Sequence, residues 1–139
     1  MEFKKFNNRY VIRLDKGDEI IESLKKICNM ENIKTASITG IGATNNATIG
    51  VYELNLKKYH EKNVKGDFEI SSLVGNISTF HGEVLPHIHV NLTGLDHNCI
   101  GGHLLSANIS ITCEIFMDIL DGEIRKEFND AVGANTFKF

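Results

Sequence analysis

The segment from Asn108 to Asp118 alternates between apolar and polar side chains, and this pattern most limits the folds open to the chain. The apolar positions are Ile109, Ile111, Cys113, Ile115 and Met117, and the polar ones are Asn108, Ser110, Thr112, Glu114 and Asp118. A period of two residues is typical of a strand that packs one face on a core. The chain must therefore build a sheet with one buried and one polar face.

Only one segment shows the spacing of a helix, from Asp18 to about Asn32. Its apolar residues recur every three or four positions, at Ile20, Ile21, Leu24, Ile27 and Cys28. β-branched residues separated by polar turns predict strands at Tyr10–Leu14, Lys34–Ile41, Ala47–Leu54 and Phe68–Thr79. Because the strands follow one another after a single helix, we expect an α+β fold over residues 1–139: one domain with an antiparallel or mixed sheet and the helix on one face.

Charge and cysteine content narrow the class of protein. The formal net charge is −3, so no global positive field attracts a nucleic-acid backbone. The three cysteines, Cys28, Cys99 and Cys113, form no CxxC pair, which favours reduced thiols in a cytoplasmic protein. The polar amino-terminal segment lacks the apolar run of a signal peptide, and no stretch approaches membrane-spanning length.

Two histidines share one face of a second alternating segment, Leu85–Leu92. In a strand, His87 and His89 point one way while Ile88, Val90 and Leu92 point the other. Their α-carbons would lie roughly 6.6 Å apart, from which both rings can reach one zinc ion at about 2.0–2.1 Å. The pair is therefore a candidate half of a site for zinc or another divalent transition metal.

His103 is the candidate third ligand, because the polar connection 94–98 should return the chain antiparallel. If Gly94 pairs with Cys99, His103 lies opposite Val90 and on the wrong face. A one-residue shift corrects this, either through a bulge at Gly101–Gly102 or through a loop of odd length. Three histidine ligands would leave the fourth zinc position open to water or a small-molecule ligand.

The alternative interpretation is three unrelated strand histidines. His60, His81 and His97 have no comparable partners, and we expect them to be exposed or in loops. Glu114 and Thr112 would lie on the polar face of the adjoining strand. They are candidates for a proton acceptor or a supporting contact near the metal. The alternative is that both are solvated or interface polar residues. Cys99 is an alternative soft ligand.

Two further motifs predict no site. Gly40–Asn45 is similar to the start of a dinucleotide fingerprint but lacks its third glycine, so we expect a bend between strands. The basic stretch Lys57–Lys65 is more typical of a solvated face than of a phosphate site. Buried positions for Cys28 and Cys113 would leave neither thiol with a catalytic role.

Most of the chain, roughly residues 9–130, resembles the plant and prokaryote conserved (PPC) domain, which in plants is joined to AT-hook DNA-binding segments. The residues that carry the resemblance are Ile38–Ala43, Gly66–Ile70, Ser72–Leu73, Gly75–Asn76, His87–Val90, Gly101–Leu104 and Thr112–Ile115. The resemblance implies a compact α/β fold that assembles as a homotrimer. It also implies that His87, His89 and His103 hold a metal, as the matching histidines do in bacterial and archaeal relatives.

The sequence departs from the plant members in two places. The arginine-glycine-arginine-proline hook is absent, and the only proline is Pro86. In the segment similar to the plant partner-recruiting motif, Asp67 stands where the plant proteins have arginine. Two hypotheses follow: a homotrimeric zinc-binding PPC-domain protein with a regulatory, DNA-associated role, and a small metal-dependent enzyme in which Glu114 accepts a proton.

Overall fold

The chain forms eight strands and one helix in a computed structural model that describes residues 1–139. The elements are β1 (Glu2–Phe6), β2 (Arg9–Asp15), α1 (Ile20–Met30), β3 (Ala36–Glu53), β4 (Lys58–Phe80), β5 (Glu83–Gly94), β6 (Cys99–Ile119), β7 (Arg125–Asn129) and β8 (Ala134–Lys138). The fold is therefore mainly β with one short helix, which corrects the larger helical share that an α+β assignment suggests. The helix α1 is not long and apolar enough to cross a membrane.

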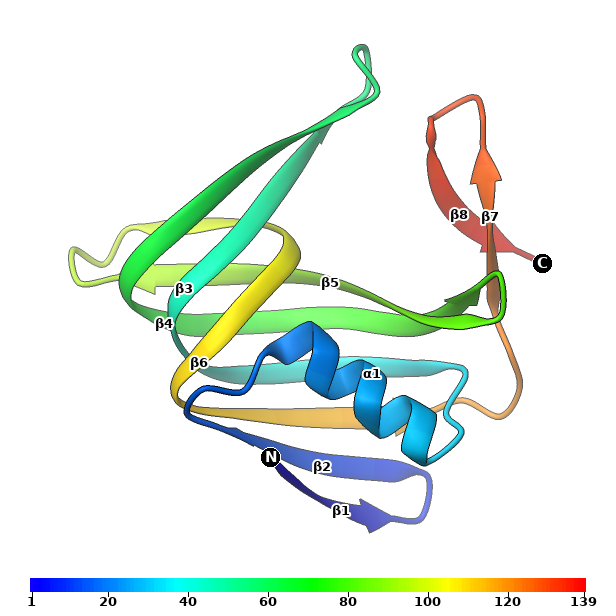
Figure 1. Cartoon of the computed structure of the whole chain (residues 1–139), viewed down its shortest axis with the longest axis horizontal. Coiled ribbons are helices and arrows are strands. Elements are labelled where there is room, and N and C mark those ends of the chain that lie inside the picture. The colour runs from blue at the N-terminus through cyan, green and yellow to red at the C-terminus, as the bar shows by residue number, and fades with distance from the viewer.

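The strands form one mixed sheet in the order β1-β2-β6-β3-β4-β7-β8, and β5 pairs with both β4 and β6 (Figure 1). Every pairing is antiparallel except the bridge between Thr79 in β4 and Arg125 in β7. Because β6 also pairs with β3, and β3 with β4, strands β3, β4, β5 and β6 form a closed ring of pairings. The ring places β5 and the start of β6 side by side.

The core lies between α1 and the sheet, as the helical spacing predicted. Ile20, Leu24 and Ile27 of α1 are fully buried against the inner face of the sheet, and α1 packs on β5 and β6. The helix begins after Glu19, whose carboxylate accepts a hydrogen bond from the Glu22 backbone N–H. This packing fixes the inner face of β5, and therefore also its outer face.

The predicted strand Asn108–Asp118 is confirmed as part of β6. One residue of its apolar stripe, Ile111, does not lie on the buried face as predicted. Ile111 is 69% exposed, whereas Ile109 and Cys113 on either side are buried. The register of β6 against β3 shifts here, because Gly42 pairs with Cys113 and Thr44 with Ile109. Two extra residues of β6 therefore bulge out and carry Ile111 away from the core.

The segment Gly40–Asn45 is a bend within one long strand, so the expected strands 34–41 and 47–54 are both part of β3. Register shifts against β4 and β6 mark the bend. Glycine is required at position 42, because a Cβ there would lie 2.6 Å from the Thr112 carbonyl oxygen of the neighbouring strand.

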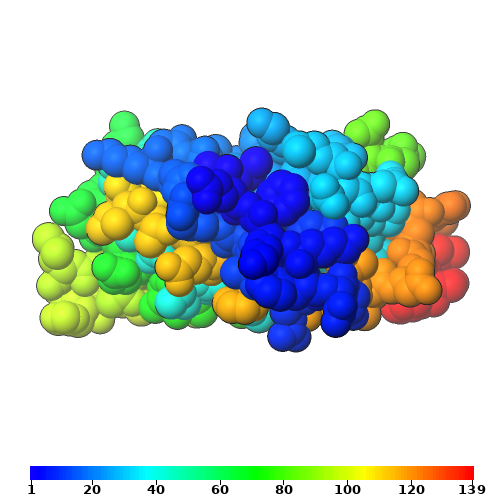
Figure 2. Space-filling model, turned by 90° about the horizontal axis from the view of Figure 1, so that it is seen from below, coloured from blue at the N-terminus to red at the C-terminus, as the bar shows by residue number.

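The two ends of the molecule are formed by different hairpins. Figure 2 shows the amino-terminal hairpin β1–β2 in the middle of the face toward the viewer, with the carboxyl-terminal segment at one end of the molecule and the β5–β6 connection at the other. Figure 1 shows the β3–β4 hairpin and the β7–β8 hairpin both standing above β5. The residues around the histidines come from these two hairpins and from β5 and β6.

Candidate metal centre

Strand β5 presents His87 and His89 on its outer face. Ile88 and Val90 are buried in the core, so the alternating residues must point away from it. Across β4, His89 is paired with Val74 and His87 with Asn76. The sequence prediction that the two imidazoles share a face is confirmed.

The register of β6 brings His103 to the same face. Thr93 pairs with Cys99, which places His103 directly opposite His89. The loop 94–98 has an odd number of residues, so the second of the two sequence alternatives is correct and the pairing needs no bulge at Gly101–Gly102.

Those two glycines instead allow close approach of neighbouring strands. A Cβ at Gly102 would lie 2.7 Å from the Gly50 carbonyl oxygen of β3, and one at Gly101 would lie 2.6 Å from the Val90 carbonyl oxygen of β5. Position 103 is therefore held by close backbone packing on both sides, because β6 pairs with β3 and β5 here.

The three imidazoles converge. Ring centroids are 5.3 Å apart for His87 and His89, 5.2 Å for His87 and His103, and 5.7 Å for His89 and His103. One ring nitrogen of each lies within 4.8 Å of the others. Two nitrogens on a tetrahedral zinc lie about 3.4 Å apart, so rotations of the rings can bring three nitrogens to one ion.

Burial favours the neutral form of the His87 and His103 rings, which is the form that binds metals. It lowers the pKa of His87 to about 4, with smaller contributions from Lys126, His103 and His89. Burial also lowers the pKa of His103, with His89 and Lys126 acting in the same direction. In addition, His103 Nδ1 is buried without a hydrogen-bond partner, an unsatisfied atom that fits coordination of a metal at this position.

A cavity of about 610 Å³ opens beside the histidines. His87 and His103 line it together with apolar and aromatic side chains from β4, β5 and β7, namely Tyr59, Phe80, Leu85, Pro86 and Phe128. The two standing hairpins are joined across it, because Tyr52 Oη donates to the Val132 carbonyl oxygen at 2.9 Å and Lys57 Nζ donates to the Asp130 carbonyl oxygen at 2.6 Å. The cavity is therefore lined by chain segments that lie far apart in sequence.

Lys126 on β7 is a site residue that sequence reasoning missed. Its side chain is only 7% exposed, and Nζ lies 3.2 Å from His87 Nδ1. Burial lowers the pKa of Lys126. No local sequence pattern identifies this residue. Its place beside His87 depends on how the β7–β8 hairpin is positioned, and β7 is joined to the rest of the sheet by a single bridge to β4.

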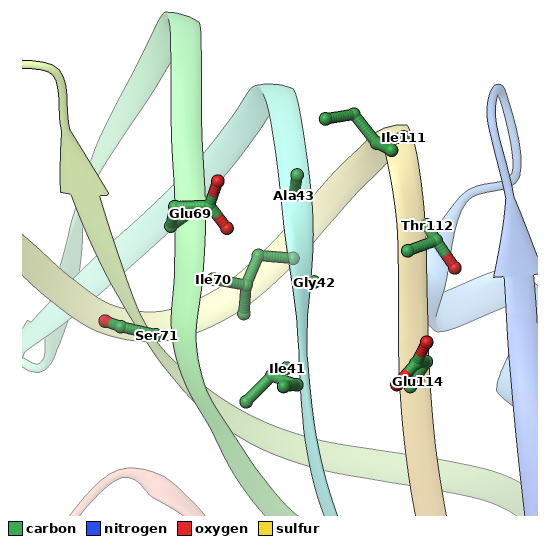
Figure 3. Close-up of a pocket in the computed structure, with 9 residues that line it drawn as sticks. All are labelled: Ile41, Gly42, Ala43, Glu69, Ile70, Ser71, Ile111, Thr112 and Glu114. Carbon is green, nitrogen blue, oxygen red and sulfur yellow. The ribbon is translucent and has the colours of Figure 1, made fainter.

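Glu114 and Thr112 are not brought to the histidines. They line a separate hollow of about 440 Å³ across β4, β3 and β6, whose lining includes none of the three rings (Figure 3). Roughly 36 Å of extended strand separates Glu114 from His103, since each residue advances a strand by about 3.3 Å. The structure gives no support to Glu114 as proton acceptor at the histidine site.

The remaining candidates also lie outside the cluster. Cys99 is exposed at the start of β6 and does not belong to the group of convergent ligand atoms. His60, His81 and His97 are all exposed, and the latter two adopt positive φ in turns, as expected of loop residues. Cys28 and Cys113 are buried, as the apolar patterns predicted.

Comparison with known proteins identifies related folds. Residues 1–121 match the family model of the Plants and Prokaryotes Conserved domain. A Bacteroides thetaiotaomicron protein provisionally assigned as DNA-binding is 31% identical, with a TM-score of 0.96, covering 99% of this chain and 96% of that one. The comparison with curated proteins found no match.

Two archaeal structures are also similar. A metal-containing protein from Archaeoglobus fulgidus is 34% identical, with a TM-score of 0.90 and coverage of 99% of this chain and 97% of that one. A plant- and prokaryote-conserved protein from Pyrococcus horikoshii is 28% identical, with a TM-score of 0.88 and coverage of 99% and 94%.

Proposed function

This chain belongs to the Plants and Prokaryotes Conserved domain family, and from that premise we propose that it is a zinc-binding protein whose metal is held by His87, His89 and His103. The observation that carries the proposal is the convergence of three ring nitrogens within 4.8 Å on one sheet face. The metal-containing relative from Archaeoglobus fulgidus adds support.

The residues fit zinc better than a hard cation, because imidazole nitrogen suits zinc while magnesium and calcium prefer oxygen ligands. Three protein ligands leave a position open toward solvent or a bound molecule, and zinc at such a site acts as a Lewis acid. His89 and His103 hold their places through strand pairing, and His87 lies beside Lys126.

Metal analysis tests this proposal. Protein purified without added metal, then stripped with a chelator, should take up one zinc ion per chain in a calorimetric titration. Replacing His87, His89 or His103 with Gln should weaken zinc binding by more than about tenfold, since a ligand is lost. The matched control is His97→Gln, at an exposed turn, which should bind like wild type. Equal zinc affinity in all four variants would refute the site.

We further propose that the protein is a homotrimer. Val74 on β4 and Phe116 on β6 both pair with Thr39 of β3, so these two apolar residues share one face of the sheet. Ile41 lies two residues beyond Thr39 and is also exposed. Ile41, Val74 and Phe116 form what we term the outer apolar patch, and contact with further copies of the chain would cover it.

We also propose that the protein has a regulatory role in which it binds DNA. The provisional assignment of the Bacteroides relative as DNA-binding supports this role. The net charge of −3 opposes it, because DNA binding depends on neutralising phosphates. A retardation assay with duplex DNA at physiological salt tests this role. DNA binding at that salt concentration would support it, and no binding would refute it. With reduced cysteines, we place the protein in the cytoplasm.

The second candidate is a small metal-dependent enzyme, which the cavity beside the histidines favours. In this candidate the metal would polarise a carbonyl group or activate water. Glu114 lines a different hollow and has no part in it.

A further inference from the structure

Lys126 is a buried cation without an acidic partner. It takes part in none of the ion pairs of the chain. Its ammonium group instead approaches His87 Nδ1 at 3.2 Å and the Phe137 ring, whose centroid lies 5.3 Å away. A buried charge normally pairs with an opposite charge, so this arrangement is incomplete within the chain.

The charge surplus grows once the proposed metal is bound. Three neutral imidazoles add no negative charge to a divalent ion, and the lining of the cavity contains no aspartate or glutamate. The metal and Lys126 would therefore place three positive charges at one end of the cavity. An anion is the ligand that completes such a site.

The cavity walls define the rest of the ligand. Tyr59, Phe80 and Phe128 contribute aromatic surface, and Leu85 and Pro86 aliphatic surface. A volume of about 610 Å³ falls within the range of sites for small organic molecules. Inorganic anions would leave this apolar surface uncovered, whereas an organic anion would bury it.

We propose that the cavity binds a small organic carboxylate with an apolar body, whose carboxylate group lies between the metal and the Lys126 ammonium. This inference rests on the metal site proposed above. Asn135 Oδ1, which is buried without a partner at the wall of the cavity, would accept a hydrogen bond from a hydroxyl or N–H group on the ligand.

The test uses protein loaded with Co²⁺, whose visible absorption reports a change of ligand at the open position. Benzoate is the probe, benzamide its uncharged analogue, and inorganic phosphate the anion without an apolar body. In wild type, benzoate should bind more tightly than benzamide or phosphate and should change the cobalt spectrum. Lys126→Met should weaken benzoate binding about 10- to 100-fold, the usual loss of a charged hydrogen bond, with Co²⁺ uptake retained.

Lys65→Met, at an exposed position of β4, is the matched control and should bind benzoate like wild type. If Lys126→Met does not fold, Lys126→Gln serves in its place. Equal benzoate affinity with and without Lys126, benzamide binding as well as benzoate, or phosphate binding more tightly than benzoate would each overturn the inference while leaving the metal site intact. Failure to take up Co²⁺ or Zn²⁺ would overturn the metal site itself, and the inference with it.

Discussion

His89 on β5 lies directly opposite His103 on β6, with ring planes perpendicular and centroids 5.7 Å apart. Directly opposed residues share a sheet face, so this single pair decides whether the third imidazole reaches the other two. A slip of one residue would turn His103 toward the core. The candidate metal site therefore depends on the register of the β5–β6 hairpin.

A side chain at position 75 is expected to lower both the stability of the fold and the affinity of the histidine site for zinc. A Cβ at this position would overlap the His87 carbonyl oxygen and lie 2.9 Å from Ile88 Cα. Gly75→Ala should therefore push β5 away from β4, lowering the free energy of unfolding by about 1–3 kcal/mol and weakening zinc binding. Chemical denaturation and zinc titration measure both effects, with the exposed Glu69→Ala as control. An unchanged denaturation midpoint would contradict the steric argument.

His87 should make the metal-free protein less stable in mild acid. Its pKa is lowered to about 4, mainly by burial, from an ordinary value of 6.5. Between these values the unfolded chain binds more protons than the folded one, so stability falls as pH drops from about 6.5 to about 4. His87→Gln should make this part of the curve of thermal midpoint against pH less steep, measured with chelator present, while His103, whose pKa burial also lowers, retains part of the slope. His81→Gln, at an exposed turn, should leave the curve as steep as in wild type.

The face that carries His87 and His89 could be predicted because alternation along a strand is a local property. The position of His103 could be narrowed to two alternatives only, since register depends on which residues pair across strands. The loop 94–98 settled it through its odd length. Ile111 followed the alternation in sequence but not in structure, because a bulge depends on the neighbouring strand β3.

Neither the position of Lys126 nor the cavity could be predicted from the sequence. The β7–β8 hairpin has no strong apolar alternation, and it reaches the histidines only after the chain has crossed the sheet. Conversely, the sequence made Glu114 a candidate because the segment Asn108–Asp118 was expected to form a separate strand beside the histidine hairpin, whereas it continues the strand that carries His103. That strand is long, and only its first residues lie at the histidines.

Only one thiol per chain should react with iodoacetamide at pH 8 under native conditions. Burial raises the pKa of the Cys28 thiol to about 12, and burial with the nearby Glu114 charge does the same for Cys113. Their thiolate fraction at pH 8 is then about one in ten thousand, while Cys99 is exposed. Mass spectrometry should find one added group when folded and three when unfolded. Modification of a native Cys99→Ser variant would contradict this assignment.

Val74 should be needed for assembly if the outer apolar patch is covered in a homotrimer. Its side chain is 55% exposed on the face that carries His89. Val74→Asp would place a charge in the interface, and light scattering should then find a 15.5 kDa monomer in place of a trimer. Val51→Asp is the matched control, since Val51 is 63% exposed on the β3–β4 hairpin, outside the patch. A wild-type protein that is already monomeric would refute the assembly.

The hydroxyl of Tyr52 should hold the β7–β8 hairpin over the cavity. It lies 2.9 Å from the Val132 carbonyl oxygen and 3.0 Å from that of Gly133, which share its one hydrogen. Tyr52→Phe should cost about 1 kcal/mol of local stability, so amides of β7 and β8 should exchange with deuterium about fivefold faster. The control is Tyr59→Phe, because the Tyr59 ring packs against Tyr52 and His103 while its hydroxyl forms no hydrogen bond within the chain. Unchanged exchange in Tyr52→Phe would mean that aromatic packing, which both variants keep, and not the Tyr52 hydroxyl, holds the hairpin and Lys126 in place beside the histidines.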